Sequence, residues 1–205
     1  MRSGNWAIWM ALLWAVGCNS RPGAIRPPSL DPADAAEAAI ELYDASDDGM
    51  LSKEEWSLSP ELTAVVERYD TNSDASLTDE EIAEGIRGWQ EGPVGVRAVL
   101  FRVSFAGRPL SGATVKLVPA SFLGDAIKPA TGEANQAGAG KLGVAPEDLP
   151  RNAPKMKLAQ PGLYHVEITH PKIKIPEKYN TKSTLGVEIS GAYPGVEGIV
   201  WNLTK

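Results

Sequence analysis

Two acidic segments of twelve residues constrain the fold of this chain more than any other feature. They are DASDDGMLSKEE at Asp44–Glu55 and DTNSDASLTDEE at Asp70–Glu81, and they begin 26 residues apart. The aligned positions that carry the same or a similar residue include Asp44/Asp70, Asp48/Asp74, Leu51/Leu77, Ser52/Thr78 and Glu55/Glu81. A short acidic run is usually a solvated loop. This repeated spacing of oxygen-bearing side chains instead suits a hard cation, because Ca²⁺ takes about six to eight oxygen ligands at about 2.3–2.6 Å.

A twelve-residue loop wraps a calcium ion when positions 1, 3, 5, 7, 9 and 12 point inward. In the first segment these positions are held by Asp44, Ser46, Asp48, the backbone carbonyl of Met50, Ser52 and Glu55. In the second segment they are held by Asp70, Asn72, Asp74, the backbone carbonyl of Ser76, Thr78 and Glu81. Both segments therefore resemble the EF-hand calcium loop, and the resemblance covers residues 31–90. It implies a tandem pair of calcium sites that binds one or two ions.

The residues around both loops have the apolar spacing of amphipathic helices. Before each loop, apolar residues recur at i, i+3, i+4 and i+7: Ala36, Ala39, Ile40, Tyr43, then Leu62, Val65, Val66, Tyr69. Ser59-Pro60 is typical of the start of the second of these helices. Ser52–Glu55 and Thr78–Glu81 are typical of capping boxes, so the end of each loop is also expected to begin a helix.

Two positions within the loops predict how they pair and how they differ. Leu51 and Leu77, both apolar at the eighth position, are expected to join the loops through a short β-bridge. The sixth position, where the chain turns sharply with a positive φ, is Gly49 in the first loop and Ala75 in the second. A left-handed conformation costs a residue with a Cβ roughly 1–2 kcal/mol, which predicts roughly tenfold weaker binding in the second loop. An acidic helical pair that never holds metal is the alternative.

The N-terminal residues resemble an export signal. A mostly apolar run at Trp6–Val16 is too short to span about 30 Å of hydrocarbon, and it fits the apolar region of a secretory signal peptide over residues 1–17. The sequence AVGC at Ala15–Cys18 resembles the lipobox of bacterial lipoproteins. It implies lipidation of Cys18 and a membrane-anchored, exported location in the bacterial cell envelope. Cys18 is the only cysteine, and a free thiol or an intermolecular disulfide is the alternative. Residues 18–30 are expected to form a tether.

The charge of the chain limits which partners it can have, and its length limits the number of domains. The formal net charge is −6, and no cluster of Lys and Arg interrupts the acidic balance. This composition argues against a nucleic-acid partner and against electrostatic docking on anionic lipid. After removal of the expected signal, the chain is long enough for two modest domains. We expect the EF-hand pair over residues 31–92 and a second domain over residues 93–205.

Beyond Gly92-Pro93, which is expected to end the last helix, the apolar period changes to that of a strand. Five segments alternate apolar and polar residues: 99–105, 113–117, 164–169, 185–190 and 199–203. Five half-buried strands separated by Gly/Pro turns favour an antiparallel β-sandwich. Residues 145–160, rich in Pro and charge, are expected to form a surface excursion. The predicted fold class is therefore multidomain α+β, with a helical pair followed by an antiparallel sandwich.

Four strings in this second part carry a further resemblance: FAGRPLSGATVKLVP, ATGEANQAGAGKLGV, PGLYHVEI and IPEKYNTKSTLGVEIS. They are similar to the carboxypeptidase-regulatory-like, transthyretin-type sandwich of bacterial surface lipoproteins. The resemblance covers residues 94–203. It implies a first hairpin marked by Gly107–Pro109 and Gly112–Ala113, a turn at Gly138 and a central strand after Pro161-Gly162. It implies an extracytoplasmic setting and no reaction.

The chain offers few residues for catalysis. It has two histidines, and a transition-metal pair at His165 and Glu167 is disfavoured against exposed polar residues on a strand. Iron binding through two tyrosines and two histidines would require four side chains to converge: Tyr164, Tyr179, His165 and His170. The opposite strand parity of His170 argues against it. No histidine lies near a convincing Ser–acid partner, so nucleophilic catalysis has no candidate.

Three hypotheses of function follow. The first, which we favour, is a non-enzymatic, calcium-binding, lipid-anchored protein that presents the sandwich to a partner. The second is an interaction module for an unknown envelope protein or glycan, in which metal is incidental. The third is an enzyme, which would need His165, Glu167 and another acid to converge in a concave pocket.

Overall fold

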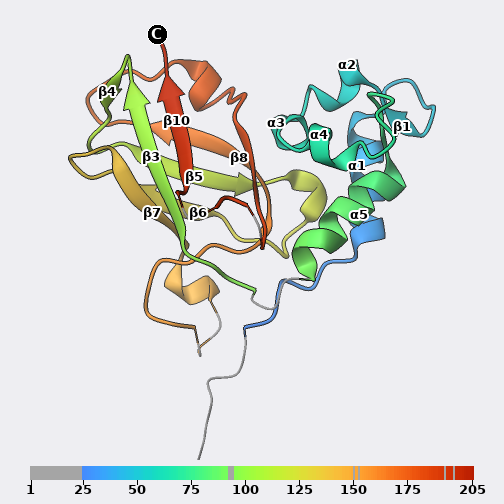
Figure 1. The fold of residues 1–205 in the computed structure, drawn as a ribbon, viewed down its shortest axis with the longest axis horizontal. Helices are drawn as coiled ribbons and strands as arrows, with labels where there is room; N and C mark the ends of the chain where they lie inside the picture. The colour runs from blue at the N-terminus through green and yellow to red at the C-terminus, as the bar shows by residue number, and fades with distance from the viewer. Residues whose placement is uncertain (1–24, 92–94, 150, 152, 192, 196) are drawn as a thin grey trace, which may run out of the picture.

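The computed structural model describes residues 25–91, 95–149, 151, 153–191, 193–195 and 197–205. A helical part, up to residue 91, lies beside a β part that begins at residue 95 (Figure 1). The expected signal peptide, Cys18 and most of the expected tether lie outside the described residues, as does the expected boundary at residues 92–93. No helix in the described ranges is both long enough and apolar enough to cross a membrane.

The helical part has one long helix at each end and single turns of helix between them. Its elements are α1 (Pro32–Tyr43), β1 (Met50–Leu51), α2 (Lys53–Trp56), α3 (Pro60–Thr63), α4 (Val66–Tyr69), β2 (Leu77–Thr78) and α5 (Asp79–Gln90). Asp31 caps α1, because its Oδ1 accepts the N–H of Ala33 at 2.9 Å. Helices α1 and α5 pack against each other and hold the segment between them together (Figure 1).

The single helix expected before the second acidic segment is instead two short helices, α3 and α4. Val65, between them, has φ −122° and ψ −11°, which breaks the helix. Val65 and Val66 are adjacent β-branched residues, which are stiff in a helix, and α3 is held separately by its packing on the β part. The predicted start at Ser59-Pro60 is confirmed, since Ser59 Oγ accepts the N–H of Leu62 at 3.2 Å.

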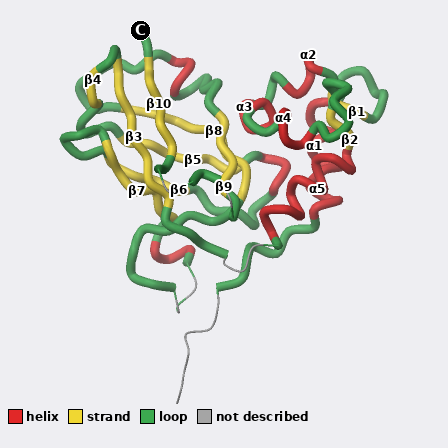
Figure 2. The backbone as a smooth tube through the Cα atoms, in the orientation of Figure 1, coloured by secondary structure: helices red, strands yellow, loops and turns green. Residues whose placement is uncertain are grey.

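The β part is a curled, mostly antiparallel sheet (Figure 2). Its strands are β3 (Val99–Phe105), β4 (Arg108–Pro109), β5 (Thr114–Pro119), β6 (Ala130–Glu133), β7 (Ala139–Val144), β8 (Gly162–Thr169), β9 (Gly186–Ile189) and β10 (Ile199–Leu203). The 3₁₀ helices are η1 (Ser121–Leu123), η2 (Pro146–Asp148) and η3 (Glu177–Tyr179). The strand order is β10-β3-β7-β6-β5-β8-β9, and β4 pairs with β3.

The observed sheet differs from the predicted one in two respects. All five predicted strands form, but β10 runs parallel to β3, with Trp201 opposite Val103, so the sheet is not wholly antiparallel. The sequence pattern also missed β4, β6 and β7. Strand β6 carries no large apolar residue, and β7 carries only Leu142 and Val144 at its end, because both strands pack against the Phe101 ring. A Cβ at Gly132 or Gly140 would lie 2.7 or 2.4 Å from that ring.

The predicted turns of the β part are present. Gly107, Gly112 and Gly138 all have positive φ, of 76°, 78° and 71°. The turn at Gly138 is organised by Asn135, whose Oδ1 accepts the N–H groups of Ala137 and Ala139. In the expected surface excursion over residues 145–160, most of the described residues between 146 and 157 are exposed, while Leu158 and Ala159 are buried in the β part.

The helical and β parts contribute to one continuous apolar core. Helix α1 packs against η1, and α3 packs against β8 and β9. The approach of α3 is close, since a Cβ at Gly186 would lie 1.8 Å from the carbonyl oxygen of Pro60. A side chain at this position would therefore separate α3 from β9. The contact between the two parts was not predictable from the repeat or from the strand pattern, because neither constrains how the parts dock.

Candidate metal centre

The first acidic segment forms a loop that is held by hydrogen bonds from its own backbone N–H groups to its own carboxylates. Asp44, at the end of α1, accepts the Gly49 N–H on Oδ2 at 2.8 Å and the Ser46 N–H on Oδ1 at 3.1 Å. Asp48 accepts the Met50 N–H at 3.0 Å. Gly49 has φ +83°, as predicted for the sixth position. The bond from Gly49 also holds the pKa of Asp44 below its usual value.

Glu55 joins the end of this loop to its beginning. Its Oε1 accepts the N–H groups of Ala45 and Ser46, at 2.9 and 3.0 Å. Its Oε2 accepts the Ser52 N–H and the Ser52 hydroxyl, both at 2.8 Å. The bonds from Ser52, followed by those from Ser46 and Ala45, lower the pKa of Glu55 to about 2. The bond to the Ser52 N–H is the one expected of a capping box.

The second loop repeats this arrangement. Asp70 Oδ2 accepts the Ala75 N–H at 2.9 Å, in the place of the bond between Asp44 and Gly49. Glu81 accepts the Thr71 N–H at 3.0 Å and the Thr78 N–H at 3.1 Å. Burial raises the pKa of Glu81, but the bonds from Thr78 and Thr71 outweigh it, and the pKa lies below its usual value. Ala75 has φ +69°, so the predicted left-handed strain is present.

The two loops pair as the sequence predicted. In the antiparallel bridge of β1 and β2, Leu51 lies opposite Leu77, and both side chains are fully buried. A second link was not predicted: the Trp56 Nε1–H donates to the carbonyl oxygen of Ala75 at 3.0 Å. Trp56 belongs to α2, after the first loop, so each loop is fixed partly by the other.

The hydrogen bonds bring several predicted ligand positions together. In the first loop, the carboxylates at positions 1 and 12 lie close together, because the Ser46 N–H donates to both Asp44 and Glu55. In the second, positions 1 and 3 meet, because the Asp74 N–H donates to both Asp70 and Asn72. Ser52 and Thr78, at position 9, are both bonded to the glutamate at position 12.

The donor chemistry of both loops fits Ca²⁺, while the arrangement of the carboxylates is not that of a closed cage. Both loops offer only oxygen donors, the type that Ca²⁺ takes. Within the described ranges, no group of three or more His, Cys, Asp or Glu side chains lies close enough to hold a metal ion. The glutamates at position 12 are bonded to loop N–H groups. They would have to exchange those partners to contact an ion with both oxygens.

His165 and Glu167, considered above as exposed strand residues, lie differently from that expectation. His165 Nδ1 lies 3.0 Å from Oε1 of Glu61 on α3, and Nε2 lies 3.6 Å from Oε1 of Glu167. The hydrogen bond to Glu61 raises the pKa of His165 against the effect of burial. Burial acts to raise the pKa of Glu61, but bonds from His165 and Ser59 lower it below its usual value. His165 therefore belongs to the contact between the two parts of the molecule.

The other residues considered for iron binding have separate hydrogen-bond partners. The His170 ring bonds to the carbonyl oxygen of Ser111 through Nε2, at 2.9 Å. The Tyr164 hydroxyl donates to the Gln160 carbonyl oxygen at 2.9 Å. The Tyr179 hydroxyl lies 3.0 Å from the Thr204 hydroxyl. Each side chain thus serves its own local contact.

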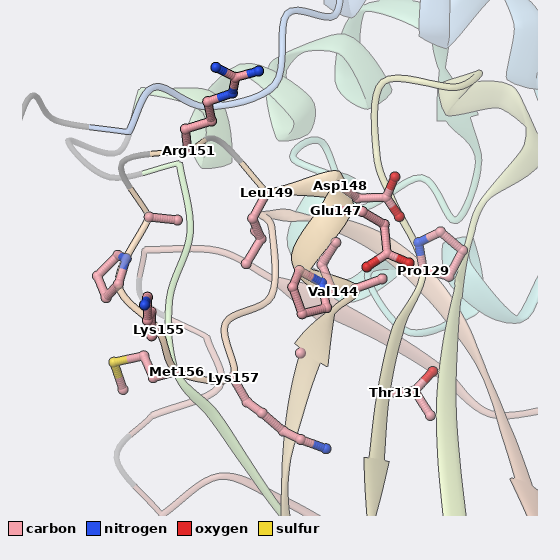
Figure 3. A pocket seen from close by; sticks show the side chains of 15 residues that line it. Pro129, Thr131, Val144, Glu147, Asp148, Leu149, Arg151, Lys155, Met156 and Lys157 are labelled. Atoms are coloured by element: carbon pink, nitrogen blue, oxygen red, sulfur yellow. The ribbon is translucent and has the colours of Figure 1, made fainter.

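A cavity of 1140 Å³ lies away from the loops, between β6, the end of β7 and the excursion that follows β7 (Figure 3). Its lining combines apolar side chains with acidic Glu147 and Asp148 and basic Lys155 and Lys157. The sequence pattern missed it, because the excursion carries no motif.

Comparisons with known proteins add little. No family model matches the chain, and no curated protein matches it. Among solved structures it is similar to a DUF3823 family protein from Parabacteroides merdae, with 13% sequence identity and a TM-score of 0.30. The match covers 53% of this chain and 45% of that protein.

Proposed function

We propose that this chain is a non-enzymatic calcium-binding protein whose two acidic loops form an EF-hand pair. The observation that carries the proposal is the repetition of one hydrogen-bond pattern in both loops. Position 1 accepts the N–H of position 6, and position 12 accepts the N–H groups of positions 2 and 9. The loops are joined back to back through Leu51 and Leu77. Carboxylates concentrated on loops of this kind repel one another unless a cation neutralises them.

The proposed role of calcium is structural. Extracellular calcium modules work at about 10⁻⁴–10⁻³ M, where such a site is saturated outside the cell. A sensor instead opens a Met-rich groove when calcium binds. Between residues 25 and 91 Met50 is the one methionine, and it lies in β1. The sites would therefore stabilise the helical part and hold it against the β part.

We also propose that the protein is exported and held at a membrane by lipid on Cys18. The support is the sequence AVGC after a short apolar run, together with the absence of any other cysteine. The β part would then be a transthyretin-type, carboxypeptidase-regulatory-like sandwich presented to an envelope protein or glycan. Its curled, mostly antiparallel sheet is consistent with this architecture.

Calorimetric titration of residues 19–205 tests the calcium proposal. We expect two binding events for Ca²⁺ that differ about tenfold, with the first loop tighter, because Ala75 carries a left-handed backbone that costs roughly 1–2 kcal/mol. Magnesium is the control ion, since it dehydrates reluctantly and demands stricter geometry. A flat calcium titration together with an unchanged melting temperature would reject the proposal.

A second candidate function is an interaction module in which metal is incidental. The cavity of 1140 Å³ favours it, because a lining of prolines, Met156 and charged side chains can hold an extended ligand. The same titration separates the two candidate functions, because an interaction module of this kind does not need to bind calcium and so predicts no heat of calcium binding.

A further inference from the structure

The second loop is connected to the β part through the residues on either side of it. Tyr69, the last residue of α4, directly precedes Asp70, the first position of the loop. Tyr69 is buried, with 5% of its surface exposed, and its hydroxyl donates to Oε2 of Glu188 on β9 at 3.2 Å. The residue that leads into the loop therefore has its polar end fixed in the β part.

Arg68 makes the same connection. Its Nη2 lies 2.9 Å from Oε2 of Glu188, and its guanidinium lies over the Tyr193 ring at 5.3 Å from the centroid. The Glu188 side chain is 7% exposed, while that of Arg68 is 45% exposed. A carboxylate this buried requires a cationic or hydrogen-bonding partner. Arg68 and Tyr69 supply both, so Glu188 holds α4 in one position.

Helix α5, which follows the second loop, contacts the Tyr69 ring. Gly85 on α5 lies four residues after Glu81, and a Cβ there would fall 2.2 Å from Cζ of Tyr69. Tyr69 is thus held between α5 and β9. A cavity of 510 Å³ at this junction is lined by Glu81 as well as by Arg68, Tyr69 and Glu188. The helices before and after the second loop are therefore both positioned by Tyr69, whose hydroxyl donates to Glu188.

From these contacts we infer that Glu188 is a positioning residue for the second calcium loop. This inference rests on the proposed calcium function. Glu188 contacts no ion itself; it fixes Arg68 and Tyr69, and through them the distance between the two ends of the loop. Because binding couplings are reciprocal, calcium in the second loop also strengthens the docking of α4 on β9.

The test measures Ca²⁺ affinity of the second loop alone, by calorimetry on residues 19–205 in a Glu55→Gln background. Glu188→Gln and Arg68→Gln should each weaken this affinity by about fivefold or more, the lower end of typical couplings between sites. The two substitutions change the charge in opposite directions. Arg68→Gln removes a positive charge close to Asp70, so through-space electrostatics alone predicts tighter binding. Only a positioning role predicts weaker binding from both.

Two control variants match the charge changes away from the junction. Arg87 pairs with Glu80 and Glu84 on the surface of α5, and it lies six residues after Glu81 of the second loop. Arg87→Gln is expected to leave the affinity unchanged or slightly tighter. Glu177→Gln removes an exposed carboxylate that pairs with Lys182, and it should change nothing. Arg68→Lys keeps the charge and should restore much of the affinity.

The measured affinities test the positioning role of Glu188 separately from calcium binding itself. Weakening by both Glu188→Gln and Arg68→Gln, with folded protein confirmed by circular dichroism, supports it. Weakening by Glu188→Gln with tightening by Arg68→Gln, or no change in either, overturns it while leaving the calcium function intact. A chain with Glu188 and Arg68 intact that takes up no calcium in either loop overturns both.

Discussion

Replacing Glu55 by Gln is expected to abolish the tighter of the two calcium-binding events. The twelfth position of such a loop supplies two oxygens to the ion, and Glu55 carries one of the three carboxylate charges among the predicted ligands of the first loop, with Asp44 and Asp48. Gln supplies one neutral oxygen in nearly the same volume. We expect the loss to exceed the roughly 10–100-fold that follows removal of an outer-shell partner of a metal ligand. Calorimetric titration of residues 19–205 with Ca²⁺ measures it directly.

Glu81→Gln is the matched control for this prediction, because it makes the same change in the second loop. It should remove the weaker event and leave the tighter one within about threefold, a shift that the shared bridge of β1 and β2 can carry. If Glu55→Gln and Glu81→Gln had the same effect, or if Glu55→Gln left both events in place, the assignment of the tighter site to the first loop would be wrong.

The second large effect is a loss of stability, and it is expected from a substitution at the contact between the helical and β parts. His165→Ala leaves the carboxylate of Glu61, 5% exposed, without its cationic partner. Breaking a buried pair costs about 3–5 kcal/mol, and the 29% exposure of the His165 side chain places the loss near 3 kcal/mol. Urea denaturation monitored by tryptophan fluorescence gives the free energy of unfolding. His170→Ala, which removes a half-buried histidine that bonds to the carbonyl oxygen of Ser111 and has no carboxylate among its hydrogen-bond partners in the described residues, is the control and should cost less.

The same pair predicts a dependence of stability on pH. The pKa of His165 is raised on folding, so its contribution is complete below about pH 6.5 and is lost as pH rises through the raised value. The pKa of Glu61 is lowered, so its contribution is present above about pH 4.3 and is lost as pH falls through the lowered value. The difference in unfolding free energy between the unsubstituted chain and His165→Ala should therefore be largest near pH 5.5. A difference that is equal or larger at pH 8.5 would contradict the pairing.

The sequence predicts the local structure of the loops well because short-range chemistry determines it. The positive φ at Gly49, the bridge between Leu51 and Leu77, and the position of Glu81 at the start of α5 all follow from residues within one loop and its repeat. The strain at Ala75 follows in the same way. Calcium binding itself stays a prediction, because it depends on how the carboxylates rearrange around an ion.

What the sequence does not predict depends on contacts between distant residues. Strands β6 and β7 are formed around the Phe101 ring, so their glycines are a consequence of packing and carry no alternating pattern. His165 has the parity of an exposed strand residue, and only the docking of α3 against β8 covers it. Glu188, likewise, occupies a polar position of a strand, and its partners Arg68 and Tyr69 lie more than a hundred residues away in the chain.

The most direct test of calcium binding is anomalous diffraction from crystals of residues 19–205 grown with calcium. We predict one ion in the first loop, bound by oxygens of Asp44, Asp48 and Glu55 at about 2.3–2.6 Å. Glu55 should have released the N–H groups of Ala45 and Ser46 to bind it. Crystals grown in saturating calcium in which those two bonds persist, with no anomalous peak between the three carboxylates, would contradict the proposed calcium function.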